Sequence, residues 1–436
     1  MASDRIFCGK CGSSADYWRN YSTFPIRRCA VSKAFATRAV HAGRHDFNAL
    51  GVHAPPLDLS STYPTPDLGA AAASFDALVT GEAPQGSGIY SRLYNPTTDR
   101  FERALAELEG AEDAAAFASG MAAITAVLMD AKARGGHIVA VRPIYGTTDH
   151  LISAGTLGLD VTWTDADHIA DALRPDTALV LIETPANPTL ALIDIADVVR
   201  QSGSVPVCVD STFATPVLQR PLAHGATFVV HSATKFLGGH GDVLAGVVAG
   251  AHSAIAPLKH LRAATGGVLH PLASYLLHRG LPTLELRVLR MQETARRLAM
   301  RLADDARIAE VMYPDLPHRD PRELLGRQMA GPGSLLSFRL AEDTAEAMQR
   351  VISGLTLITP AVSLGSTDTL IQPPAALTHR VVDAAARAAT GISPGLARLS
   401  VGLEDVEDLW TDLDRALAVV RARAPLHSTE VPALTL

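Results

Sequence analysis

The chain has 436 residues, with 38 lysines and arginines against 45 aspartates and glutamates, so its formal net charge is −7. This length exceeds what one hydrophobic core usually organises, and two domains are expected. The acidic balance offers no electrostatic footprint for nucleic acid or anionic lipid, and no apolar run reaches the roughly 18 residues of a membrane helix. We therefore expect a soluble, cytoplasmic protein that acts on a small molecule.

Residues 1–33 differ in composition from the remainder of the chain and contain Cys8, Cys11 and Cys29. Cys8 and Cys11 have the spacing of half a zinc knuckle, but the second pair of ligands is missing. A disordered leader without a metal is the preferred interpretation, and a metal site is the alternative. Turn signals then recur over 34–88, which predicts an irregular, extended N-terminal arm.

A change of rhythm follows the arm. Helical periodicity covers 96–110 and 120–132, and the next segments alternate between amphipathic stretches and short apolar runs. These runs predict strands at 137–141, 178–182, 205–209 and 227–231. The alternation is typical of a mostly parallel sheet covered by helices, and we assign this α/β domain to residues 89–285.

The second domain begins within a long helical pattern over 272–302, which Arg279-Gly280 and Pro282 interrupt. Strand patterns at 334–340 and 397–401 and helical patterns at 343–352 and 406–422 follow it. They predict a smaller α+β domain over 286–425, with a tail at 426–436.

Lys235 lies in the stretch His231-Ser-Ala-Thr-Lys-Phe-Leu-Gly-Gly-His-Gly-Asp242, directly after an apolar run. A lysine placed after a strand, flanked by the hydroxyls of Ser232 and Thr234 and followed by glycines, suits a Schiff-base lysine beside a bound phosphate. Taken alone, such a lysine is more often a solvated loop charge. The segment points to pyridoxal 5'-phosphate as the cofactor.

Other segments have the chemistry to bind the same cofactor. Gly120 and Met121 open a helix after Ser119, and the N–H groups at that helix end can receive a phosphate, although a simple helix cap is the alternative. Asp210 ends a strand and can hold a pyridine nitrogen protonated, although an aspartate there can also cap the next helix. Tyr145 follows another strand, where its ring could stack on the cofactor and its hydroxyl deliver a proton, or where it could only pack.

Two arginines are candidates for binding anions. Arg398 can pair bidentately with a substrate carboxylate, because the guanidinium group is planar. Tyr90 and Arg92 offer a hydroxyl and a guanidinium to a phosphate, and a solvated surface pair is the alternative.

From residue 36 to residue 422 the chain resembles the Cys/Met-metabolism family of pyridoxal-phosphate enzymes. The resemblance rests on ordered motifs: Tyr90-Ser-Arg92 with Asn95-Pro-Thr97, Ser119-Gly120-Met121, Glu183-Thr-Pro-Ala-Asn187-Pro, Asp210 with Thr212 and Pro216, Ser232-Ala-Thr-Lys235, Ser363-Leu-Gly365, Thr378-His379 and Arg398. It implies the aspartate-aminotransferase-like fold (fold type I): a large, mostly parallel α/β domain and a smaller C-terminal α+β domain.

The resemblance also implies a role for each matching residue. The residues implied in catalysis are Lys235, Tyr145 and Asp210. Those implied in holding the cofactor are Lys235, Gly120, Met121, Ser232, Thr234, Asp210, Tyr145, Asn187 at the phenolic oxygen, and Tyr90 and Arg92 from a neighbouring subunit. Ser363 and Arg398 would position the substrate carboxylate, and Val362 would influence specificity. Active sites shared between subunits imply a homotetramer built as a dimer of dimers.

Within the family, residues 210–250 most resemble methionine γ-lyases, which implies γ-elimination on a methionine-like or homocysteine-like amino acid. Cystathionine enzymes commonly carry a glutamate where this chain has Val362, and an apolar residue there argues against a distal ammonium group. The chain departs from the methionine γ-lyase pattern at Thr147, Arg262-Ala263 and Tyr94. The sequence therefore does not determine which side chain the substrate carries. A γ-replacement transferase, of the O-acylhomoserine sulfhydrylase or cystathionine γ-synthase type, is the alternative. A non-enzymatic paralogue is disfavoured because Lys235 and its partners are intact.

Overall fold

A computed structural model describes residues 33–421. The chain divides into two units, Met1–Ala34 and Phe35–Leu436, and the elements described below belong to the second. The predicted leader with its three cysteines and the predicted tail lie outside the described residues. No helix of the described part is long and apolar enough to span a membrane. The cytoplasmic location stays a prediction.

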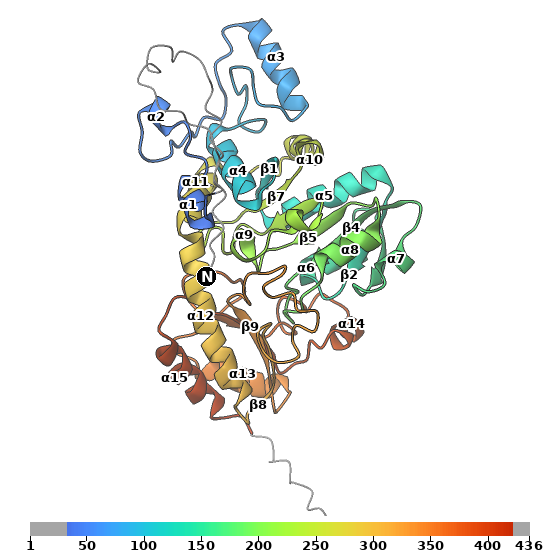
Figure 1. The fold of residues 1–436 in the computed structure, drawn as a ribbon, viewed down its shortest axis with the longest axis vertical. Helices are drawn as coiled ribbons and strands as arrows, with labels where there is room; N and C mark the ends of the chain where they lie inside the picture. Colours follow the sequence, from blue (N-terminus) through green and yellow to red (C-terminus); the bar gives the residue numbers. More distant parts are fainter. Residues whose placement is uncertain (1–32, 422–436) are drawn as a thin grey trace, which may run out of the picture. The chain divides into compact units, whose positions relative to one another are not determined.

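The larger of two sheets has seven strands (Figure 1). Its neighbours across the sheet are β1 (Asp113–Phe117), β7 (Gly246–Gly250), β6 (Phe228–His231), β5 (Val207–Asp210), β4 (Thr177–Glu183), β2 (His137–Val141) and β3 (Asp160–Thr164). Strand β7 pairs antiparallel with both of its neighbours, and the remaining pairs are parallel. The predicted mostly parallel α/β sheet is confirmed.

Helices cover both faces of this sheet because side chains alternate along each strand. In β1, Ala114 and Ala116 pack into a core shared with α4 (Pro96–Glu109) and α11 (Pro271–Gly280). Ala115 and Phe117 point to the other face, where the core includes residues of two long helices, α5 (Gly120–Arg134) and α10 (His252–Thr265). The other elements of this domain are α6 (Gly146–Ser153), α7 (Ile169–Ala172), α8 (Ile195–Ser202), α9 (Thr215–Leu218) and the 3₁₀ turn η1 (Pro221–His224).

Local capping explains where the helices near the site begin. The Asn95 side chain accepts hydrogen bonds from the N–H groups of Thr97 and Thr98, and Pro96 occupies the first turn of α4, where its missing N–H is not needed. The Ser119 side chain accepts one from the Ala122 N–H at the start of α5. The N-terminus of α5 is thereby fixed at the carboxyl end of β1.

The arm is more helical than predicted. It contains α1 (Phe35–His41), α2 (Phe47–Leu50) and the twelve-residue α3 (Leu68–Val79). Asp67 caps α3 by accepting hydrogen bonds from the N–H groups of Gly69 and Ala70, and alanines fill the turn that follows. The prediction of an irregular, extended segment was therefore wrong for 68–79.

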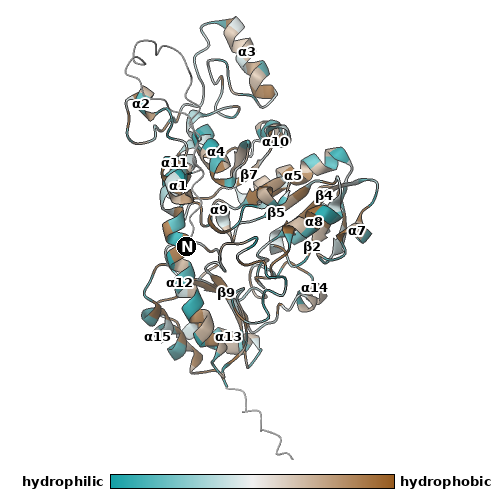
Figure 2. Ribbon diagram, viewed as in Figure 1, coloured by the Kyte–Doolittle hydropathy of each residue, from teal (hydrophilic) through white to brown (hydrophobic). Residues whose placement is uncertain are grey.

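The predicted break in the long helical pattern is confirmed. Helix α11 ends at Gly280, the 3₁₀ turn η2 (Leu281–Thr283) follows, and α12 (Leu284–Ala303) continues from it. Hydrophilic and hydrophobic residues alternate along α12 (Figure 2), and its buried side passes from the core of the large sheet to that of a second sheet. This helix connects the two sheets, while the predicted domain limits at 285 and 425 stay predictions.

The second sheet has five strands: β10 (Thr359–Pro360), β11 (Leu370–Gln372), β12 (Leu396–Ser400), β9 (Leu335–Leu340) and β8 (Ile308–Met312). It pairs antiparallel except between β10 and β11. Its helices are α13 (Ala345–Gly354), α14 (Ala384–Ala389) and α15 (Val406–Leu417), and the last ends before the predicted residue 422. The smaller C-terminal α+β region is confirmed.

Candidate active site

The candidate site lies at the carboxyl edge of the large sheet. Strands β4, β5 and β6 are parallel neighbours, so the segments that follow them meet at one edge, where open α/β sheets bind their ligands. Glu183 ends β4, Asp210 ends β5, and Lys235 follows β6 after a short loop. A cavity of about 440 Å³ opens among them.

The cavity brings together most of the residues that the sequence singles out. Eleven of the thirteen predicted site residues line it. They are Gly120, Met121, Tyr145, Asn187, Asp210, Ser232, Thr234, Lys235, Val362, Ser363 and Arg398. Tyr90 and Arg92 do not line it. The roles of these residues remain proposals, but their assembly around one cavity is a feature of the fold.

Lys235 is largely buried, and its Nζ donates a hydrogen bond of 2.6 Å to Ser363 Oγ. Burial, assisted by the positive charge of Arg398, lowers the pKa of Lys235 to about 8. An amine in this state is partly neutral near neutral pH, as both a nucleophile and a proton acceptor must be.

A polar cradle lies next to Lys235, where the first turn of α5 meets the loop after β6. The two segments approach so closely that a Cβ on Gly120 would stand 2.9 Å from Ser232 Cβ and Oγ, so only glycine fits. The free N–H groups of the helix start and the hydroxyls of Ser232 and Thr234 are suitable donors for a phosphate group.

Asp210 presents one carboxylate oxygen to the cavity and uses the other within the protein. Its Oδ1 accepts hydrogen bonds from the N–H of Thr212 at 3.0 Å and from the hydroxyl of Thr212 at 2.5 Å. Thr212 Oγ1 in turn accepts from the Ser232 N–H at 2.9 Å, which ties β5 to the loop after β6. Burial raises the pKa of Asp210, and the bonds from Thr212 oppose this rise.

Arg398 connects the two sheets at the cavity. It extends from β12, and its guanidinium donates to Asn187 Oδ1 at 2.9 Å and to the Ser363 carbonyl at 2.8 Å. Its Nε is buried without a hydrogen-bond partner among the described residues. Burial lowers the pKa of Arg398 to about 10, so the group is still cationic at neutral pH. A carboxylate in the cavity would find an under-used cation here.

Ser363 holds its position between Lys235 and Arg398 with a backbone φ of +89°, which L-residues rarely adopt. Such a conformation persists only where the surroundings enforce it, and it is commonest at functional sites. Its hydroxyl faces Lys235 while its carbonyl faces Arg398.

Comparison with known proteins agrees with this geometry. Residues 36–418 match the family model described as Cys/Met metabolism PLP-dependent enzyme. The chain belongs to this family. Relatives named L-methionine gamma-lyase include one from Streptomyces avermitilis, 56% identical over 89% of this chain and 90% of the relative, and one from Brevibacterium sandarakinum, 51% identical over 89% and 98%. The predicted pyridoxal-phosphate dependence and carbon–sulfur lyase class are confirmed.

Solved structures of the family share the fold. Cystathionine gamma-lyase from Lactobacillus plantarum superposes with a TM-score of 0.82 at 33% identity, covering 90% of this chain and all of that one. A Micromonospora echinospora protein, described once as a cystathionine gamma-lyase and once as a methionine gamma-lyase, gives 0.79 at 39% identity over 88% of this chain and 99% of its own. The predicted fold type I is confirmed.

The cavity of this family member fits pyridoxal phosphate. A lysine with a lowered pKa, a helix N-terminus with two hydroxyls, and a buried carboxylate with one free oxygen provide contacts for the aldehyde carbon, the phosphate and the ring nitrogen. The side chains that would hold these groups are Lys235, Ser232 with Thr234, and Asp210.

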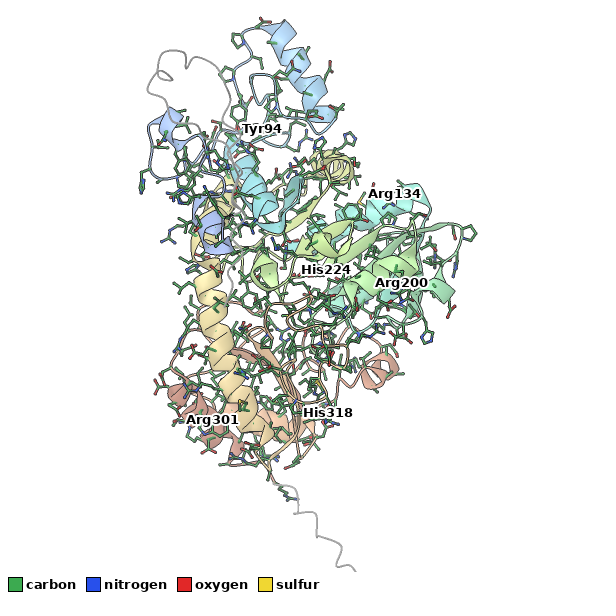
Figure 3. The ribbon with its side chains drawn as sticks, viewed as in Figure 1. Tyr94, Arg134, Arg200, His224, Arg301 and His318 are labelled. Atoms are coloured by element: carbon green, nitrogen blue, oxygen red, sulfur yellow. The ribbon has the colours of Figure 1, made fainter. Side chains whose placement is uncertain are left out.

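Tyr90 and Arg92 lie outside the cavity of their own chain. The Arg92 guanidinium donates to the Ala263 carbonyl, and the Tyr90 ring is half-exposed. Tyr94 lies just before α4 (Figure 3), donates a hydrogen bond to Asp99 and does not line this cavity. Arg262 does not line the cavity either, and it is buried in an ion pair with Glu102.

Three apolar side chains, from Leu244, Val362 and Leu377, line the cavity and are 65%, 52% and 47% exposed, respectively. Sequence reasoning found only Val362, because Leu244 and Leu377 stand in loops that no motif marks. Because they are half-exposed, these three side chains offer apolar surface to a ligand in the cavity, and they are called the apolar wall below.

Proposed function

We propose that this enzyme catalyses γ-elimination on L-methionine or a close analogue. For methionine, the reaction with one water gives methanethiol, ammonia and 2-oxobutanoate. The observation that carries the proposal is the apolar wall of Leu244, Val362 and Leu377 at a cavity whose only carboxyl groups, among its described lining, are Glu183 and Asp210.

Both of these carboxyl groups are already engaged. Glu183 accepts two backbone hydrogen bonds, and Asp210 is held by Thr212 through one oxygen while its other oxygen would contact the ring nitrogen of the cofactor. A substrate with a distal ammonium group would therefore meet these half-exposed apolar side chains without a counter-charge. The part of the ammonium that they shield from water gains no polar contact in exchange, which costs up to about 1 to 3 kcal/mol. An uncharged thioether avoids that cost.

In the proposed reaction each polar residue has one task. Pyridoxal phosphate, when bound, withdraws electrons from the substrate Cα, and Asp210 keeps its ring nitrogen protonated. Arg398 and Ser363 hold the substrate carboxylate, while Gly120, Met121, Ser232 and Thr234 hold the phosphate, and Asn187 contacts the phenolic oxygen.

Protons move through two side chains in this proposal. The Lys235 amine accepts the Cα proton, for which its lowered pKa is suited. Tyr145, whose ring lines the cavity, donates a proton to the departing sulfur. Once it is neutral again, the Lys235 amine also accepts a Cβ proton, and the bond between Cγ and sulfur breaks as Tyr145 gives its proton to the leaving sulfur.

We also propose that the site is completed by a second copy of the chain, in a homotetramer built from two dimers. Tyr90 and Arg92 do not reach their own cavity, and half-exposed Tyr90 is free to contact a neighbour. The phosphate would then receive a guanidinium from the adjacent subunit in addition to the hydroxyls of its own chain.

The test is a substrate panel. Purified holoenzyme is incubated with L-methionine, L-homocysteine, L-cystathionine and an O-acyl-L-homoserine, each with and without an added thiol, and products are identified by mass spectrometry. The proposal predicts 2-oxobutanoate and a thiol from methionine as the most efficient reaction. Preferential formation of a new thioether from the O-acylhomoserine and added thiol would instead assign γ-replacement.

A further inference from the structure

Glu183 is a buried carboxyl group that takes no direct part in the proposed reaction. It ends β4, lines the cavity and is only 4% exposed. Its pKa is raised well above the usual value, first by burial and then by the negative charge of Asp210. The positive charge of Arg398 opposes this rise, but among the described residues Arg398 donates to Asn187 and Ser363 and not to Glu183. A group that is costly to bury without a counter-ion calls for a specific explanation.

The two oxygens of Glu183 bind two different loops. Oε2 accepts the backbone N–H of Tyr145 at 2.7 Å, in the turn between β2 and α6. Oε1 accepts the backbone N–H of Asn187 at 3.0 Å, in the loop after β4. One carboxyl group therefore joins the residue that presents the aromatic ring to the residue that presents the side-chain amide.

The connection continues to the substrate side of the cavity. Asn187 Oδ1 accepts a hydrogen bond from Arg398, and Arg398 donates to the carbonyl of Ser363. The Tyr145 turn is tightly confined as well, because a Cβ on Gly146 would overlap the Thr378 carbonyl. Small displacements at Glu183 would thus move the aromatic ring and the amide together.

We propose that Glu183 is a positioning residue that holds Tyr145 and Asn187 in fixed register and so sets how both meet the cofactor. The inference rests on the proposed cofactor contacts of these two residues. It does not depend on which amino acid is the substrate, so its test uses the geometry and retention of the cofactor as readouts.

Glu183→Gln is the informative variant because it keeps the size of the side chain. A glutamine has one oxygen that accepts and one nitrogen that donates, so it can receive only one of the two N–H groups and opposes the other. The matched control is Asp412→Asn, since Asp412 is 4% exposed and also accepts several backbone N–H groups, from residues 356–358, but lies outside the cavity.

The measurements are visible circular dichroism of the bound cofactor, the cofactor dissociation constant, Tm and kcat, all on purified holoenzyme. Glu183→Gln should alter the visible dichroism, weaken cofactor binding roughly tenfold and lower kcat about ten- to a hundredfold, as expected for a small displacement of reacting groups. Asp412→Asn should lower Tm and leave the visible dichroism and the cofactor dissociation constant unchanged.

If Glu183→Gln lowers only Tm and keeps the dichroism and cofactor affinity of the wild type, Glu183 is structural and the inference is wrong. Should Glu183→Gln fail to fold, Glu183→Asp keeps the charge but shortens the reach by one methylene and should change the dichroism. Unaltered dichroism in that variant overturns the inference equally. An unexpected substrate in the panel would refute the proposed function and leave these cofactor readouts as they are.

Discussion

Replacing Val362 tests the link between the apolar wall and substrate choice. In Val362→Glu, a carboxylate enters a position that is 52% exposed and lines the same cavity as Leu244 and Leu377. An ion pair between this carboxylate and the distal ammonium of cystathionine should contribute about 1 kcal/mol, the upper end for an exposed pair, because the substrate itself excludes part of the water. Methionine should lose about 0.8 kcal/mol, the contribution of one buried methyl or methylene group.

Together these changes amount to about 1.8 kcal/mol, which shifts the ratio of kcat/KM for cystathionine over methionine by roughly twentyfold. The assay compares kcat/KM for both substrates in the wild type, Val362→Glu and Val362→Gln. The glutamine variant has the same size without the charge, so it isolates the loss of apolar contact and should shift the ratio only about fourfold. The reasoning fails if the two variants give the same ratio, or if the wild type already prefers cystathionine.

Four further predictions concern the polar side of the cavity. Borohydride should fix the cofactor to Lys235, since its hydrogen bond to Ser363 aims it into the cavity, and peptide mapping that finds the label on another lysine would contradict this. Asp210→Asn should keep the cofactor but lower kcat about a hundredfold or more, because the ring nitrogen loses its anionic partner; near-normal kcat would show that another group serves the ring. The Lys235 amine accepts a proton only when neutral, so kcat should rise with pH as this amine loses its proton, and a kcat that falls over the same range would exclude this role. In the apoenzyme, Lys235 has a pKa of about 8 when folded and the ordinary lysine value of 10.5 when unfolded, so the unfolded chain binds more protons between pH 8 and 10.5. The free energy of unfolding, measured by urea titration, should therefore rise over this pH range. In Lys235→Met this rise should be absent.

The main helices and several strands could be predicted from local signals. Asn95 with Pro96 predicts the start of α4, and the uninterrupted apolar runs of β2 and β4 predict buried parallel strands. Strand β1 was not predicted because the helix propensity of its sequence, Asp-Ala-Ala-Ala-Phe, is high. The segment forms a strand by pairing with β7. Helix α3 was not predicted because the turn residues on both sides of it indicated an irregular segment, so that Asp67 was not identified as a helix cap.

The site, too, could be predicted only in part from the sequence. Lys235, Asp210 and Arg398 could be predicted because motifs place reactive groups at strand ends or beside glycines. The bonds that hold them could not, because they join distant segments: Lys235 to Ser363, Asn187 to Arg398, and Glu183 to Tyr145. Leu244 and Leu377 carry no chemical signature, and only the fold brings them to the cavity.

The central claim is that this cavity converts methionine by γ-elimination with Lys235 as the essential amine. The most direct measurement quantifies methanethiol, ammonia and 2-oxobutanoate formed from L-methionine by the wild-type holoenzyme and by Lys235→Ala supplied with cofactor. The account predicts equal amounts of the three products from the wild type and essentially none from the variant. Methionine recovered unchanged from the wild type, or equal product formation by Lys235→Ala, would contradict it.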